Sequence, residues 1–232
     1  MPDKTWKIIV PNDYFVDKKN YTIDGKEYAR VTRILGVIAK HGLASWYMKV
    51  GKVKAKQIIE KRQIIGTKVH KLFELTLKKE EYDLSKYEYE IKTDVELFIP
   101  FAKNTKLESR ALEQKLWSNK HRYAGTADYI GQYKSCKEYL IRGHEAKFKK
   151  SSLVIGDWKT SKAIYKDYWL QLAAYAFAFY ELTGVKVAGA FIAQFRDGKV
   201  KVDEKTWDEL VDRFRVFKAA LVLYEDVYNV KR

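Results

Sequence analysis

The sequence predicts an α/β fold in which a helical N-terminal part precedes a β-rich core. Three observations indicate this order. Apolar residues recur at helical spacing before residue 102, strand-like alternation appears in 111–117, 123–133 and 153–159, and a long amphipathic stretch closes the chain. With 232 residues and 47% hydrophobic content, the chain can form a single domain spanning 1–232, or one domain with a helical annex.

The first hundred residues are expected to be mainly helical. Residues 6–10 are expected to be extended, and Asp24-Gly25 is a two-residue sequence typical of a tight hairpin turn. Thr32 is the predicted N-cap of the first helix. The predicted helices cover 31–39, 44–53, 54–63, a segment restarting at Gly66, and 95–102, with a loop over 79–90. Residues 31–65 would then form a helical part that packs on the core.

Residues 66–203 are expected to form that core. Two strands, 111–117 and 123–133, flank a turn, and the lysine-rich segment 134–152 connects them to a third strand over 153–159. The helix predicted over 168–183 is apolar on nearly every side and should be buried, with Gly184 ending it. Strands over 185–194 and 199–202 follow. Within the C-terminal segment 204–232, apolar spacing predicts an amphipathic helix from Lys205 to Tyr228.

The charge balance indicates a polyanionic partner. Lys and Arg number 45 against 30 acidic residues, which gives a formal net charge of +15. Such a chain attracts nucleic acid or an anionic membrane surface. No apolar run approaches the roughly 20 residues that span a bilayer, and the first residues lack an apolar signal core. We therefore expect nucleic acid rather than membrane as the partner, and an intracellular location: cytoplasm or nucleoid, or host cytoplasm for a viral chain.

The strongest chemical signal is a pair of acidic residues at the ends of predicted strands. Asp128 follows Gly125, and a glycine there permits close approach by another backbone or a phosphate. Asp157 and Lys159 share one face of a strand, with Trp158 on the other. The two carboxylates and the Trp158 carbonyl can hold a hard divalent cation, and the lysine can act on an attacking water. An Asp-x-Lys tripeptide alone is ordinarily an exposed ion pair, so the surrounding order of residues decides.

That order resembles the RecB-like branch of the PD-(D/E)XK nuclease superfamily. The matching segments are 66–70 (Gly-Thr-Lys-Val-His), 125–128 (Gly-Thr-Ala-Asp), 157–161 (Asp-Trp-Lys-Thr-Ser) and 171–175 (Gln-Leu-Ala-Ala-Tyr). Together with 31–35 (Val-Thr-Arg-Ile-Leu), they are most similar to phage and mitochondrial genome-maintenance exonucleases. The resemblance covers residues 32 to 180. It implies a core with a mixed central sheet flanked by helices.

The resemblance also implies roles for individual residues. Lys159 would orient or deprotonate the attacking water. Gln171 and Tyr175, one helical turn apart, would contact the DNA backbone or hold the lysine. The implied metal ligands are His70, Asp128, Asp157 and the Trp158 carbonyl. The cofactor would be one or two Mg²⁺ or Mn²⁺ ions. An iron–sulfur cluster, as in exonuclease V, is excluded because the chain has one cysteine.

Other residues have weaker assignments. Glu113 matches a glutamate seen in relatives and either supports a metal ligand or is structural, while Thr160 and Lys162 are candidate DNA contacts. Lysines in 147–150 and 159–166 are candidate phosphate contacts. Each site residue also has an ordinary alternative: His70 as a core or surface histidine, Gln171 with Tyr175 as a buried polar pair. Glu74 is expected to be solvated, and His41, His121 and His144 show no partner in the sequence.

The expected function is a metal-dependent DNA exonuclease, with the helical N-terminal part forming an arch or wall for a DNA end. Two alternatives stay open: a structure-specific endonuclease of the same superfamily, and a DNA-binding module with an inactive site. The chain has no G-x-x-x-x-G-K-[ST] phosphate loop. Partners would therefore be DNA, single-stranded or with ends, and a helicase or single-strand-binding protein in another chain. Strand polarity and oligomeric state are left open.

Overall fold

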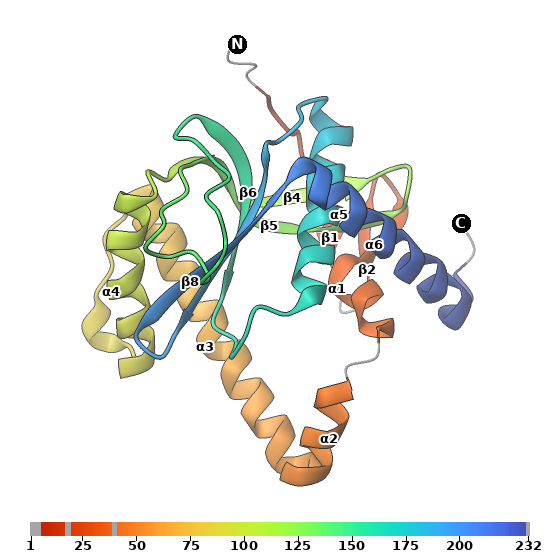
Figure 1. Ribbon diagram of the computed structural model, residues 1–232. Helices are drawn as coiled ribbons and strands as arrows, with labels where there is room; N and C mark the ends of the chain where they lie inside the picture. The colour runs from red at the N-terminus through yellow and green to blue at the C-terminus, as the bar shows by residue number, and fades with distance from the viewer. Residues whose placement is uncertain (1–5, 17–19, 39–40, 231–232) are drawn as a thin grey trace.

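The computed structural model describes residues 6–16, 20–38 and 41–230, except for the side chains of 41–44. The fold is α/β, with a mixed central sheet and helices on both of its faces (Figure 1). The strands are β1 (Phe15–Val16), β2 (Asn20–Ile23), β3 (Lys26–Arg30), β4 (Glu108–Ser118), β5 (Tyr123–Tyr133), β6 (Ser152–Lys159), β7 (Gly189–Arg196) and β8 (Lys199–Thr206). The helices are α1 (Val31–Ile34), α2 (His41–Val50), α3 (Lys52–Lys78), α4 (Tyr89–Asn104), α5 (Lys166–Thr183) and α6 (Trp207–Tyr228), with short 3-10 helices η1 (Leu35–Val37) and η2 (Leu84–Lys86).

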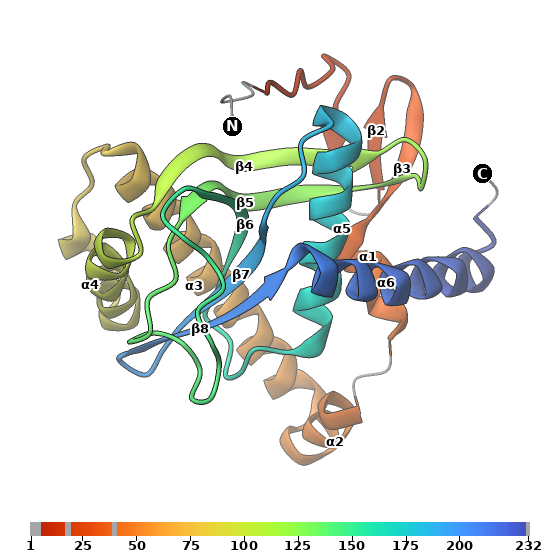
Figure 2. The same cartoon turned by 45° about the horizontal axis from the view of Figure 1, so that its top comes forward.

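The sheet has the order β1-β2-β3-β5-β6-β7-β8, with β4 paired to β5. Most neighbours are antiparallel, and the pairs β3–β5 and β6–β7 are parallel. On one face, α1, α5 and α6 bury a core centred on the apolar helix α5. On the other face, α3 and α4 bury an aromatic core that includes Trp158. Figure 2 shows these two helical layers on either side of the strands.

Several predicted elements are confirmed. Asp24 and Gly25 form the tight turn between β2 and β3, and both have the positive φ angles, 47° and 65°, that such a turn requires. The strands β5 and β6 and the buried helix α5 lie where apolar spacing predicts them. Gly184 ends α5 at a φ of 68°, a left-handed conformation that glycine adopts without strain.

Other predictions about the N-terminal part are wrong. Residues 6–10 form no strand. Thr32 is not an N-cap, because α1 begins at Val31 after Arg30 and makes no side-chain cap. The predicted helix over 31–39 is only α1 followed by η1, with residues 39–40 outside the described part. The interruption expected before Gly66 is absent: α3 is continuous, and the break comes earlier, at Gly51, whose φ of 85° ends α2.

The boundaries of several later elements also differ from the prediction. Helix α4 begins at Tyr89, so the loop predicted over 79–90 ends earlier and contains η2. Strand β8 extends to Thr206, which caps α6 by accepting from the Glu209 N–H while the Glu209 carboxylate accepts from the Thr206 N–H. This capping box sets the start of α6 at Trp207, not at Lys205. Among the described residues, none of these helices has the length and apolarity that a bilayer crossing requires.

Candidate functional site

The middle of α3, the middle of β5 and the end of β6 bring the four principal predicted residues together. His70 Nδ1 lies 3.4 Å from Asp128 Oδ2, and Lys159 Nζ lies 2.5 Å from Asp157 Oδ2. Val69, Leu72 and other apolar residues of α3 pack on the aromatic core, which fixes the helix over the sheet. One helix and two strands therefore bring together residues that lie as far apart in the sequence as positions 70 and 159.

Strands β5 and β6 separate at this site. Their paired residues end at Tyr129 and Gly156, so the next position on β5, Asp128, has no backbone partner on β6. Its side chain substitutes for one: Asp128 Oδ2 accepts the Trp158 N–H at 2.9 Å. The Trp158 ring lies on the opposite face, packed edge-on against Phe73, as the alternation of β6 predicts. The Asp128 carboxylate is thus held in place by the backbone of the strand that carries the other two polar residues.

Asp157 is almost completely buried, with 2% of its surface exposed. Its Oδ2 atom forms an ion pair with the Lys159 ammonium. The same ammonium lies over the Tyr168 ring, 4.7 Å from its centroid. The charge of the buried carboxylate is therefore offset by Lys159.

The electrostatics follow from these contacts. Burial opposes the charged form of His70, but the Asp128 carboxylate outweighs it and raises the pKa of His70. Burial likewise works against ionised Asp128, yet His70 and Lys159 keep its pKa below the usual value. For Asp157, burial and the charge of Asp128 dominate and raise the pKa to about 6. Burial alone would lower the pKa of Lys159, but Asp157 raises it. The lysine is therefore charged at neutral pH.

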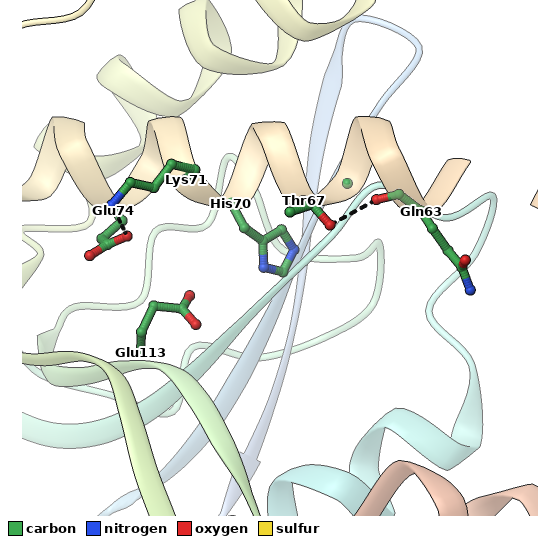
Figure 3. Close-up of a pocket in the computed structure, with 7 residues that line it drawn as sticks. Gln63, Thr67, His70, Lys71, Glu74 and Glu113 are labelled. Atoms are coloured by element: carbon green, nitrogen blue, oxygen red, sulfur yellow. Dashed lines mark hydrogen bonds and ion pairs between the residues drawn. The ribbon is translucent and has the colours of Figure 1, made fainter. Parts of the chain in front are cut away.

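Glu113 adds a third carboxylate. It has a φ of 48°, which is unusual for a residue with a side chain, and it lies between paired neighbours that place it opposite Asp128. Figure 3 shows its carboxylate facing His70 across a pocket of about 470 Å³, lined by α3 on one side and Glu113 on the other. One ligand atom each from His70, Glu113 and Asp128 lies within 4.8 Å of the others. Burial and the charge of Asp128 raise the pKa of Glu113 to about 7.

Gln171 and Tyr175 lie on one face of α5, as predicted, with Gln171 Nε2 donating to the Tyr175 hydroxyl at 3.2 Å. The Tyr175 ring is 4% exposed and fills the space over Gly125. A Cβ at Gly125 would lie 2.5 Å from Tyr175 Cε1, which no real contact reaches. The glycine thus admits a tyrosine ring, not a backbone or phosphate. Tyr175 is placed to support Gln171 from within the protein.

The segment after Lys159 is held from β7 by residues that the motifs did not indicate. Gln194 is 4% exposed, and its Nε2 donates to the Ser161 carbonyl at 2.6 Å. Arg196 approaches the Thr160 carbonyl at 3.5 Å. Thr160 is half-buried and Lys162 is exposed, so only Lys162 presents its whole side chain to solvent. A polar glutamine among the apolar residues of β7 was the sequence feature that could have indicated this contact.

The expectation about Glu74 is wrong. Glu74 is not solvated: its carboxylate, at 13% side-chain exposure, pairs with Lys71 and Lys78 at 2.8 and 2.6 Å. Hydrogen bonds from these lysines lower the pKa of Glu74. The structure supplies a partner for His144 that the sequence did not show, because its Nδ1 lies 2.9 Å from Asp203 Oδ1. His121 packs against Phe214, and the side chain of His41 lies outside the described residues.

The donor set fits a hard divalent cation. One imidazole nitrogen and oxygens from carboxylates match the ligands that Mn²⁺ and Mg²⁺ take in proteins. The like charges of Asp128 and Glu113 repel each other, and a bound cation would relieve that repulsion. His70, Glu113, Asp128 and Asp157 are the side chains that could hold such an ion; the role predicted for the Trp158 carbonyl stays a prediction.

Comparisons with known proteins leave the family open. No family model matches the chain, and no curated protein does. One solved structure, described as "Crystal structure of SSO0001", is similar at 14% identity and a TM-score of 0.40, covering 90% of this chain and 79% of that one. A similarity at this level does not identify the family of this chain.

Proposed function

We propose that this chain is a metal-dependent DNA nuclease with a PD-(D/E)XK-type core. One observation carries the proposal. Four residues that the motifs predict from separate segments form two contacting pairs, His70 with Asp128 and Asp157 with Lys159. The two pairs are linked because Asp128 accepts the N–H of Trp158, the residue between Asp157 and Lys159. Carboxylates that hold a divalent cation beside a charged lysine suit hydrolysis of a phosphodiester, in which negative charge develops on the phosphate. The resemblance to the RecB-like branch supports the same assignment.

The charge of the chain supports DNA as the substrate. At +15, the protein attracts a polyanion, although the site itself is rich in carboxylates. A divalent cation would reconcile these two facts, since it offsets the acidic side chains where the phosphate must approach. Lys162, which is exposed three residues after Lys159, is the candidate contact for a neighbouring phosphate. Lys71 lines the pocket but is paired with Glu74.

In the proposed reaction, a water attacks phosphorus and the bond to the 3′ or 5′ oxygen breaks. A bound Mg²⁺ or Mn²⁺ would lower the pKa of that water and offset charge on the phosphate. His70, Asp128 and Asp157 would hold the ion, with Glu113 within reach. Lys159 is charged, because Asp157 raises its pKa. An ammonium donates hydrogen bonds and accepts none, so Lys159 orients the water and stabilises the phosphate rather than removing a proton.

The test is cleavage of end-labelled linear DNA, single- and double-stranded, beside closed circles, with Mg²⁺, Mn²⁺ or EDTA. We expect degradation of linear DNA only, lost with EDTA and in Asp157→Asn. Asp94→Asn is the matched control, since Asp94 is an equally buried aspartate on α4 that lines no part of the pocket. Nicked circles would instead indicate an endonuclease. DNA binding without cleavage under any metal would refute the nuclease and leave a binding module.

A further inference from the structure

The ammonium of Lys159 has two close contacts among the described residues. One is Asp157 Oδ2, and the other is the face of the Tyr168 ring, with 4.7 Å between Nζ and the ring centroid. A cation over an aromatic face at this separation is attracted by the ring quadrupole. Gln171 and Tyr175, which the resemblance implies contact the DNA backbone or hold the lysine, hydrogen-bond to each other. The contacts of the ammonium itself come from Asp157 and Tyr168.

The first turn of α5 fixes the position of the Tyr168 ring. Tyr165 packs edge-on against it, with centroids 5.5 Å apart at 81°, and the Tyr168 N–H donates to the Tyr165 carbonyl at 3.2 Å. The next residue, Trp169, is 4% exposed and donates from Nε1 to Asp203 Oδ2 at 3.0 Å, which ties this turn to β8. Because the turn is anchored on both sides of Tyr168, the ring is a rigid surface against which a flexible side chain can be placed.

Lysine needs such a surface. Its ammonium is carried on a four-carbon stem with many rotamers, and the charge alone does not select one of them. In this site the carboxylate of Asp157 attracts the ammonium from one side, and the ring of Tyr168 limits it on another. The remaining N–H directions are then available to a water or a phosphate oxygen.

We propose that Tyr168 is a positioning residue that holds the Lys159 ammonium beside Asp157 in its working place. This rests on the proposed nuclease function, because Lys159 has a task there only if a phosphodiester is cleaved. The ring, not the hydroxyl, carries the effect, because the Lys159 ammonium lies over the ring face while the hydroxyl interacts with Ser161. Tyr168→Phe should therefore behave like the native protein, and Tyr168→Leu should not.

The first measurement is kinetic. In Tyr168→Leu we expect kcat to fall about three- to thirtyfold, the range that a cation–aromatic contact supports, with KM for DNA unchanged. Tyr168→Phe should restore kcat. Tyr180→Leu is the matched control, since Tyr180 lies on the same helix, is 45% exposed, and packs on Trp207 away from Lys159. An active protein whose Tyr168→Leu variant keeps its kcat, or whose Tyr168→Phe variant loses it equally, would overturn the role of Tyr168.

The second measurement does not depend on activity. Protons on the Lys159 side chain above a ring are shifted upfield by its ring current. Other lysines also lie over rings, so the NMR signal of Lys159 is identified as the upfield lysine ε-CH₂ signal that disappears in Lys159→Met. It should persist in Tyr168→Phe and vanish in Tyr168→Leu. If the native protein shows no such signal, the contact between Lys159 and Tyr168 is refuted. A native protein that shows the signal but cleaves no DNA would overturn the nuclease proposal and the catalytic role of Tyr168, while the contact would stand.

Discussion

Gly125→Ala tests the contact between two of the motifs directly. The added Cβ would lie 2.5 Å from Tyr175 Cε1 and 2.7 Å from its hydroxyl oxygen, against about 3.5–4.0 Å for ordinary contact. Tyr175 is buried, so the ring cannot simply swing into solvent. Overpacking of this kind costs about 1–3 kcal/mol. We expect the free energy of unfolding to fall by that amount, and Gln171 to be displaced with its partner.

The cause is isolated by repeating the substitution in Tyr175→Ala, where the ring is gone. There Gly125→Ala should be neutral or stabilising by about 0.5–1 kcal/mol, because alanine loses less backbone entropy than glycine in a strand. The coupling between the two sites is then on the order of 2 kcal/mol. Urea denaturation of the four proteins, with a common slope, measures it. Equal costs of Gly125→Ala in both backgrounds would show that the ring does not explain the glycine.

Three further predictions address burial, positioning and metal binding. Burial and the charge of Glu90 raise the pKa of Asp94 from 3.8 to about 7. The free energy of unfolding should therefore fall by up to ~4 kcal/mol as the pH rises from about 4 to 7. Asp94→Asn should remove this fall in urea melts at several pH values; a variant whose stability falls as much as that of the native protein would contradict it. Gln194→Leu leaves the Ser161 carbonyl unpaired, and should cost about 1–2 kcal/mol and lower kcat; unchanged melting would count against the contact. Saturating Mn²⁺, at about 100 times its Kd, should stabilise the native protein by ~2.7 kcal/mol in thermal melts, and Asp128→Asn should abolish the gain; an equal gain in the variant would place the ion elsewhere.

The fold could be predicted where local patterns decide structure. Alternation predicted β5 and β6, and the apolar composition of α5 predicted its burial. The failures lie where tertiary contacts override local signals. Gly66 is a poor helix residue, yet α3 continues through it because Ile65 and Val69 on either side are buried in the aromatic core. No local pattern in 52–78 contains that information.

The site could be predicted as a set of residues but not as a network. The motifs nominated Asp128, Asp157 and Lys159, and the structure brings them together. Residue spacing did not predict that the Tyr168 ring lies under the Lys159 ammonium. It also did not predict that Gln194 hydrogen-bonds to the carbonyl of Ser161, in the segment after Lys159. The Gln194 contact joins residues that meet only after β6 and β7 pair in parallel. The Tyr168 contact depends on how the chain turns between β6 and α5, which the spacing does not specify.

The charges around the pocket give the most direct reason to expect a cation. The carboxylates of Asp128 and Glu113 lie close to His70, and the carboxylate of Asp157 pairs with Lys159. These three carboxylates therefore face at most two positive charges, those of His70 and Lys159. The raised pKa values of Asp157, about 6, and Glu113, about 7, show that burial and mutual repulsion already work against ionising all three. A protein with +15 net charge has many lysines that could neutralise this cluster, yet the two nearest on α3, Lys71 and Lys78, are paired with Glu74 instead. A structural role would be served better by apolar residues of similar size. The cluster is the physical basis of the proposed divalent-cation site, and the Mn²⁺ melts of native and Asp128→Asn protein test that proposal.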